Sequence, residues 1–327
     1  MHAIVSKIPM IKNVIVFLFL LVFVPSVYSQ FDAQISQYML HQSAYNPAAV
    51  GQSKMIDVIG QHRLQWIGMP GAGTTTNFSI NSPIKIKKQL HGVGLRFLDD
   101  RFGGFRNQAL NLQYAYKKLL RFGDLSFGAD IGFVSVGFSG DSVAQHKITL
   151  GEYHNQMTTD PEIPQVAVQG MAMDLNIGVM YSSKAWYAGA SIKHLNNPLI
   201  NWDKNEFTVP STVYLTGGFN YYLPNPAYIM KPSALIKTDF KNSQIDLSAL
   251  LEYNNEIWGG MSYRLNNSVV LMAGMNITGG LSLSYSFDIS NNRLITSNYG
   301  SHEVLLIYSF EYVFSRKKTK CKCIRHL

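Results

Sequence analysis

The chain has almost no cysteine: Cys321 and Cys323, both close to the carboxyl end, are its only two in 327 residues. The rest of the chain therefore has no disulfide framework and no thiolate metal site. Charged residues are also few, at 15% of the chain against about 25% in an average soluble domain. Something other than surface charge must keep this protein solvated.

The net charge of +8 comes from the two ends of the chain. Lys7, Lys12 and six basic residues in 315–327 have no acidic neighbours in their segments, and the remaining 20 basic residues are matched by 20 acidic ones. A nucleic-acid-binding groove needs cations clustered on a folded face, so we expect no nucleic-acid partner. The 18 Phe, 18 Tyr and 4 Trp residues are too many for a chain that cannot bury surface.

The sequence also lacks a hydrophobic run long enough to span a membrane as a helix. The longest, Val14–Val24, has eleven residues, whereas a spanning helix needs about 20. Lys7 and Lys12 precede this run, and small residues follow it before Gln30, as in a secretory signal. We predict a cleavable signal at 1–29 rather than a membrane anchor, so the mature chain is exported.

What the sequence does have is apolar residues at every second position, the period of a strand with two different faces. In Leu281–Ser290 one face is wholly apolar, including Leu283 and Tyr285, and the other is polar, including Ser284. In 123–138 the apolar phase slips near Phe133–Val134, which suggests a β-bulge. Fourteen such runs occur, near 54–62, 74–81, 91–99, 108–117, 123–138, 171–181, 185–194, 211–221, 228–240, 243–254, 256–264, 268–277, 281–289 and 302–314.

The lengths of these runs and of their connections favour a transmembrane antiparallel β-barrel of about 14 strands over residues 53–314. Most runs have the nine to eleven residues with which a tilted strand crosses a bilayer. Long connections such as 140–170 mostly alternate with tight turns, as in barrels with long external loops, although Asn81–Gln89 and Tyr222–Pro232 are longer than this pattern prefers. An exported β-sandwich can show the same alternation of apolar and polar residues, but its architecture does not require long and short loops to alternate along the chain. An even strand count also predicts that both termini face the periplasm.

No residue set makes a convincing active site, so we expect no enzymatic activity, cofactor or metal. His154 lies near Glu152, Asp160 and Glu162, but a zinc site needs three or four convergent ligands, and a solvated external loop explains them better. Asp99 and Asp100 are adjacent on a strand end and therefore point in different directions. The loop Gly71–Gly73 opens no helix that could cradle a phosphate, and Trp66 beside it is a candidate interaction residue.

The segment at 30–52 is too irregular in polarity to be a membrane strand, and we predict an entry, interaction or plug element. Its candidate contact or turn residues are Gln37, Tyr38, Asn46, Pro47 and Gly51. The tail at 315–327 is too highly charged to fold alone. Its candidate contacts, Arg316, Lys317, Lys318 and Lys320, would meet an acidic periplasmic partner or anionic lipid, unless the tail is a solvated extension.

The entry segment resembles the start of mature PorP/SprF-family proteins of the type IX secretion system. The resemblance continues in order along nearly the whole mature chain, through Arg63–Trp66, Gly71–Ser79, Leu98–Arg101, Gln113–Tyr116, Trp186–Pro198, Gly260–Leu265 and Ser297–Glu303.

This resemblance implies a non-enzymatic β-barrel in the outer membrane of a Gram-negative bacterium. The barrel would support secretion or surface display of particular cargo and, in gliding species, motility. Its partners would be outer-membrane lipid, the periplasmic and outer-membrane components of the secretion machinery, and a specific secreted cargo protein. The alternative is a passive outer-membrane channel or a fatty-acid-type transporter, which would require a lumen open to solutes.

Overall fold

The computed structural model describes residues 32–53, 55–87, 89–139, 167–202, 205–277, 279–291, 296 and 298–311. Over these residues the chain forms strands and two single-turn 3-10 helices, η1 (Gln42–Ala44) and η2 (Pro47–Ala49). No helix in these ranges is long and apolar enough to cross a membrane. The strands are β1 (Ile56–Leu64), β2 (Thr74–Ile86), β3 (Gln89–Phe102), β4 (Phe105–Leu120), β5 (Gly123–Phe138), β6 (Val168–Ser182), β7 (Trp186–Lys193), β8 (Leu199–Trp202), β9 (Asn205–Thr208), β10 (Thr212–Phe219), β11 (Tyr221–Tyr222), β12 (Tyr228–Thr238), β13 (Ser243–Tyr253), β14 (Ile257–Arg264), β15 (Ser268–Ile277), β16 (Leu281–Ser290) and β17 (Ser301–Phe310).

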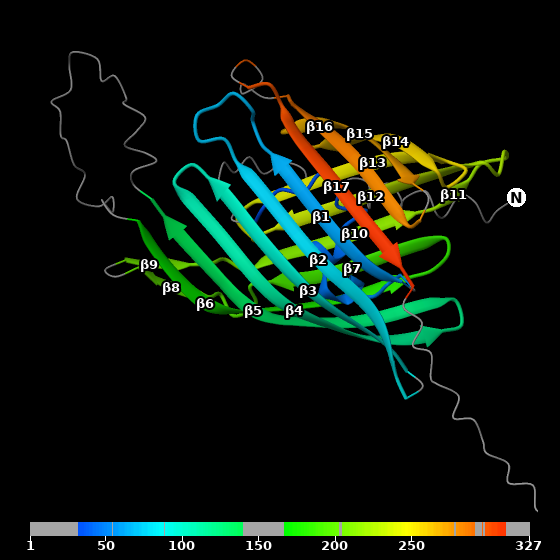
Figure 1. Cartoon of the computed structure of the whole chain (residues 1–327), viewed down its shortest axis with the longest axis horizontal. Helices are drawn as coiled ribbons and strands as arrows, with labels where there is room; N and C mark the ends of the chain where they lie inside the picture. Colours follow the sequence, from blue (N-terminus) through cyan, green and yellow to red (C-terminus); the bar gives the residue numbers. More distant parts are fainter. Residues whose placement is uncertain are drawn as a thin grey trace, which may run out of the picture.

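Fourteen of these strands form one closed antiparallel barrel, seen obliquely in Figure 1. Neighbours in sequence are neighbours in the sheet, and β1 pairs with β17 from Ile56–Phe310 to Leu64–His302. Between β7 and β12 the wall is completed by β10, which pairs with both. The two-residue β11 pairs only with β12, directly after β10. The predicted fold class is therefore confirmed.

The faces of the barrel are inverted relative to a soluble protein. On β16 the outward Leu283 and Tyr285 are 40% and 43% exposed, while the inward Ser284 and Ser286 are 6% and 0% exposed. On β4 the outward Leu112 is 63% exposed. An apolar outer surface with a polar interior is the arrangement that lipid solvates, so the barrel spans a membrane and the facing predicted for β16 is confirmed.

The strand pairs β1–β2, β5–β6, β7–β10 and β16–β17, which the four longest connections join, all end at the same end of the barrel. We call it the outer end, because long loops are typical of the external side of such barrels. The opposite, inner end has short turns, as barrels have on the periplasmic side. The connection predicted at Asn81–Gln89 is shorter than expected, because β2 continues to Ile86 and β3 begins at Gln89. β12 begins at Tyr228, where the run near 228–240 predicted it. The connection before it, 220–227, remains longer than the other turns at the inner end.

The bulge predicted near Phe133–Val134 is wrong. β5 keeps a continuous register with β4 and β6 across these residues. Val134 and Val136 face inward in the regular alternation of β5. They are 0% and 1% exposed because Ile200 of the hairpin β8–β9 and Val209, the residue after it, pack against them. The apparent phase slip is a local patch of apolar lumen rather than an extra residue. The hairpin was not predicted.

Candidate functional site

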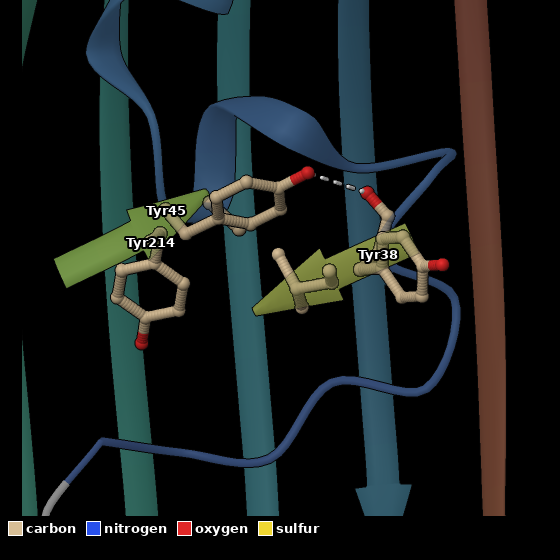
Figure 2. Packing of buried hydrophobic residues seen from close by; sticks show 5 residues of the cluster. Tyr38, Tyr45 and Tyr214 are labelled. Carbon is tan, nitrogen blue, oxygen red and sulfur yellow. Dashed lines mark hydrogen bonds between the residues drawn. The ribbon is translucent and has the colours of Figure 1, made fainter. Parts of the chain in front are cut away.

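Residues 32–52, the plug, pass through the interior of the barrel without forming a strand. Gln37, Tyr38 and His41 are each 0% exposed. The plug runs from Asp32, next to Lys193 at the outer end of β7, to Gly51, beside Gly92 near the inner start of β3. Figure 2 shows part of it crossing the inner surface of the strands. The prediction that both termini face the periplasm concerns residues outside the described ranges and stays a prediction; the first described residue, Asp32, lies at the outer end.

Asp32 is held by four side chains of the wall, with its own side chain 2% exposed. Its carboxylate pairs with Lys193 and His194 and accepts a 2.8 Å hydrogen bond from the Tyr214 hydroxyl. The Lys237 ammonium donates to the Asp32 carbonyl oxygen at 2.7 Å. The ammonium group of Lys193 supplies the positive charge that balances this buried carboxylate.

A second anchor joins the plug to β17. The Glu303 carboxylate accepts hydrogen bonds from the backbone N–H groups of Ser36 at 2.9 Å and Gln37 at 3.0 Å. The same carboxylate forms a 3.3 Å ion pair with Arg63, whose other terminal nitrogen lies 2.8 Å from Asp288. All these groups are buried, so their polar atoms depend on one another for partners.

Between the two anchors and the inner end, the plug packs against the barrel wall through aromatic side chains. Tyr38 and Tyr45 form an apolar cluster with Tyr214 and Leu235 of the wall (Figure 2). The Tyr45 and Tyr214 rings stack at a centroid distance of 5.4 Å, and the Tyr45 hydroxyl donates to the Tyr38 carbonyl oxygen at 3.3 Å. Aromatic burial of this kind adds a large apolar contact to the polar anchors.

The inner half of the plug is held by hydrogen bonds with wall residues. Its own backbone conformation is stabilised by a helix cap within the plug. The Arg96 guanidinium donates to the Ala44 carbonyl oxygen at 2.8 Å, and both ring nitrogens of His41 lie 2.9 Å from wall oxygens. The Asn46 side chain accepts from Ala48 N–H at 2.9 Å and so caps η2. Gly51 has φ +62°, a conformation that favours glycine.

Glycines in the wall leave room for this half of the plug. A Cβ atom at Gly128 would lie 2.2 Å from the Ala48 nitrogen, and one at Gly92 would lie 2.0 Å from the Val50 carbonyl oxygen. In both cases the obstacle is backbone, which cannot rotate away. Strand glycines at such positions mark a close backbone approach, so the wall is shaped for an occupant rather than for open water.

We therefore expect Gly128→Ala to displace the inner half of the plug while the barrel still forms. The added methyl group overlaps backbone atoms, and overpacking of this kind costs about 1–3 kcal/mol. Faster cleavage between residues 39 and 52 by an added protease would report the displacement. The matched control is Gly60→Ala, whose Cβ meets nothing within 4 Å; equal cleavage rates in the two variants would contradict the proposed fit.

Two cavities border the plug. One, of about 20 Å³ and lined by Arg63, Asn77 and Arg96 among others, has the size of a single water. The other, of about 330 Å³, lies between the plug and the inner part of β1 and β2 and is lined by Met39, Gln52, Ser53 and Asp57 among others. The first cavity is too small to hold a solute larger than water.

Five of the predicted contact or turn residues lie together in the plug, where they contact the barrel wall or shape the plug backbone: Gln37, Tyr38, Asn46, Pro47 and Gly51. Trp66 lies apart from them in connection 65–73, where its backbone N–H donates to Ser301 and its ring packs edge-on against Phe102. The tail candidates Arg316, Lys317, Lys318 and Lys320 fall outside the described residues.

Sequence reasoning missed the wall residues that hold the plug, Arg63, Asp288 and Glu303. The available signal was charged residues at inward positions of strands. Asp99 pairs with Arg101 and Arg106, whereas Asp100 accepts from Thr75, so the two carboxylates do not converge. Within the described ranges, no group of three His, Cys, Asp or Glu could hold a metal; the loop around His154 lies outside them.

Comparisons with known proteins give a family and distant structural likenesses. The family described as type IX secretion system membrane protein PorP/SprF matches residues 27–308. Among solved structures, a deletion mutant of the TodX monoaromatic hydrocarbon channel is 11% identical, with a TM-score of 0.47 over 86% of this chain and 95% of that one. A Pseudomonas aeruginosa FadL homologue is 11% identical, with a TM-score of 0.42 over 81% and 93%. No curated protein matches significantly.

Proposed function

Because the chain belongs to the PorP/SprF family of type IX secretion system membrane proteins, we propose that it is a non-enzymatic outer-membrane component of that system. In this role it supports secretion or surface display of cargo and, in a gliding organism, motility. The observation that carries the proposal is the plug, whose sequence resembles that of the family. Two charged anchors hold it, and glycines of the wall make room for its backbone. Such a seat favours a specific interaction element over a frayed terminus.

The alternative, a passive channel or fatty-acid-type transporter, requires a route for solutes. The plug occupies the lumen of the described barrel from Asp32 to Gly51, and the cavity beside its outer half is about 20 Å³. Two buried ion-pair clusters would have to separate before the outer half could move. A lumen that holds a buried, anchored segment supports a scaffold or docking role better than transport.

The proposed partners follow from the surfaces of the barrel. Outer-membrane lipid covers the apolar outer face. Cargo would be contacted at the outer end, and periplasmic components of the secretion machinery at the inner end. The tail at 315–327 would contact an acidic periplasmic partner or anionic lipid head groups, each basic residue near the lipid contributing about 1 kcal/mol.

Deleting residues 31–50 tests the proposal. The closed strand pairing of β1 with β17 does not involve the plug, so we expect a heat-modifiable barrel in the outer membrane together with loss of cargo secretion. In planar bilayers the truncated barrel should conduct ions and the intact one should not. Normal secretion by the truncated barrel would contradict the scaffold role, and steady conductance by the intact one would favour the channel.

A further inference from the structure

The larger cavity beside the plug, of about 330 Å³, falls in the size range of pockets that bind small groups. Gln42 and Gln52 of the plug line it on one side, and Asp57 and Asn81 of the wall line it on the other. Gln52 is exposed, and Ser53 and Asp57 are half-buried, so the cavity can be reached from solvent at the inner end. A group bound there contacts the plug and the wall together.

Hydrogen-bond acceptors line the cavity from paired positions on two strands. Asp57 of β1 and Asn81 of β2 are register partners, and residues directly opposite each other in an antiparallel pair share a face of the sheet. The Asn81 amide nitrogen donates to Ser43 at 2.9 Å, while its oxygen is buried and has no hydrogen-bond partner among the described residues. A buried acceptor without a partner is unfavourable, so a bound donor would stabilise this site.

Asp57 adds a negative charge to these acceptors. Among the described residues it forms no ion pair, and its carboxylate accepts hydrogen bonds from two hydroxyl groups, those of Ser53 and Ser309. A carboxylate can accept about four hydrogen bonds, so acceptor positions remain. Lys117 also faces inward at this end, but it lies on β4, three strands from β1 in the sheet, and does not line the cavity.

The remaining lining includes apolar side chains, those of Met39, Leu40 and Ile59. A ligand that matches the whole cavity therefore needs an apolar part and a cationic group that donates hydrogen bonds. Basic side chains have this composition, because an alkyl stem carries the charged head. A bare metal ion does not, and within the described ranges no group of three His, Cys, Asp or Glu could hold one.

We propose that this cavity binds the side chain of an arginine, with its guanidinium group donating to the oxygens of Asp57 and Asn81 and its stem against Met39 and Ile59. The planar guanidinium presents several donors in a fixed fork, so it can serve two neighbouring acceptors at once. A side chain bound there joins the plug to β1 and β2 and stabilises the seated plug. The site does not depend on the role in secretion, and it exists in either orientation of the barrel in the membrane.

The test uses the purified full-length barrel in detergent, with N-acetyl-arginine amide as the probe and the uncharged N-acetyl-citrulline amide as the matched ligand. Isothermal titration calorimetry measures binding. Asp57→Asn removes the charge of the site and keeps the size of the side chain. The control is Glu256→Gln, which removes an exposed carboxylate between β13 and β14, at the same end of the barrel but outside the cavity. Heat modifiability verifies that each barrel has folded.

We expect saturable binding of the arginine probe at one site, at least tenfold weaker for Asp57→Asn and unchanged for Glu256→Gln. The citrulline analogue should also bind at least tenfold more weakly than the arginine probe. Equal weakening in the two variants, or equal affinity for the two ligands, would overturn the proposal, because neither result requires the charge of Asp57.

The same titration on a barrel that ends at residue 311 identifies the source of the arginine. Phe310 pairs with Ile56, next to Asp57, and six basic residues follow in 315–327. Binding that appears only after this truncation would show that the chain's own tail fills the cavity, whereas equal binding to both barrels would show that the side chain comes from another polypeptide. Absence of saturable binding to both barrels would reject the site.

Discussion

Replacing Leu283 by Arg is expected to prevent accumulation of the barrel in the outer membrane. Leu283 is 40% exposed on the outward face of β16, where its surroundings are lipid. Arg near the midplane of a bilayer costs about 2–4 kcal/mol in barrels of this kind, and Tyr285→Arg should behave similarly. Immunoblotting of outer-membrane fractions, with and without heating, measures the folded barrel, and Leu283→Ala serves as the size control.

Ser284→Arg should have a different effect from both. In a water-filled lumen, Arg at this inward position would be tolerated. The structure places Ser284 against the plug, where its hydroxyl donates to the Gln37 side chain and it is 6% exposed. We now expect this variant to reach the membrane with its plug displaced. Equal loss of all three arginine variants would contradict the facing of β16.

Glu303→Gln is expected to release the outer half of the plug. The glutamine keeps the size of the side chain but removes the charge that Arg63 and two plug N–H groups share. Removing one partner of a buried ion pair typically costs about 3–5 kcal/mol, because the other charge loses its partner. A lower melting temperature in detergent, together with faster proteolysis within 32–40, would record the change.

The control for this prediction is Asp99→Asn, which also removes a paired carboxylate. The partners of Asp99, Arg101 and Arg106, have side chains 57% and 48% exposed, and ion pairs of this kind contribute about 0–1 kcal/mol. The melting temperature should therefore change little. If both variants melt alike, the buried cluster around Glu303 does not hold the plug.

The strands could be located from sequence because the alternation of faces is a local property. The runs predicted at 123–138 and 268–277 coincide with β5 and β15. Bounds were less accurate where the inward face is irregular, as in β2, whose last residues Ser82–Ile86 include a proline and break the alternation. The phase slip at Val134 led to the wrong prediction of a bulge, because the sequence of β5 does not indicate that a separate hairpin covers its inner face.

The candidate site could be predicted only in part. Irregular polarity marked 30–52 as a non-strand element, and that much is confirmed. The wall residues that hold it were not predictable, because a charged inward residue has the same pattern whether it faces water or a plug. Ser36 and Glu303 are 267 positions apart, a pairing that no local spacing reveals.

That separation in sequence has a consequence for the order of assembly. Glu303, which binds Ser36 and Gln37 of the plug, belongs to β17, the last strand of the barrel. The seat of the plug is therefore incomplete until the whole polypeptide has been exported, and the lumen must close around a segment that is already inside it. Contacts so distant in sequence slow folding, so we expect the plug to reach its final position late, when β17 pairs with β1 and closes the barrel.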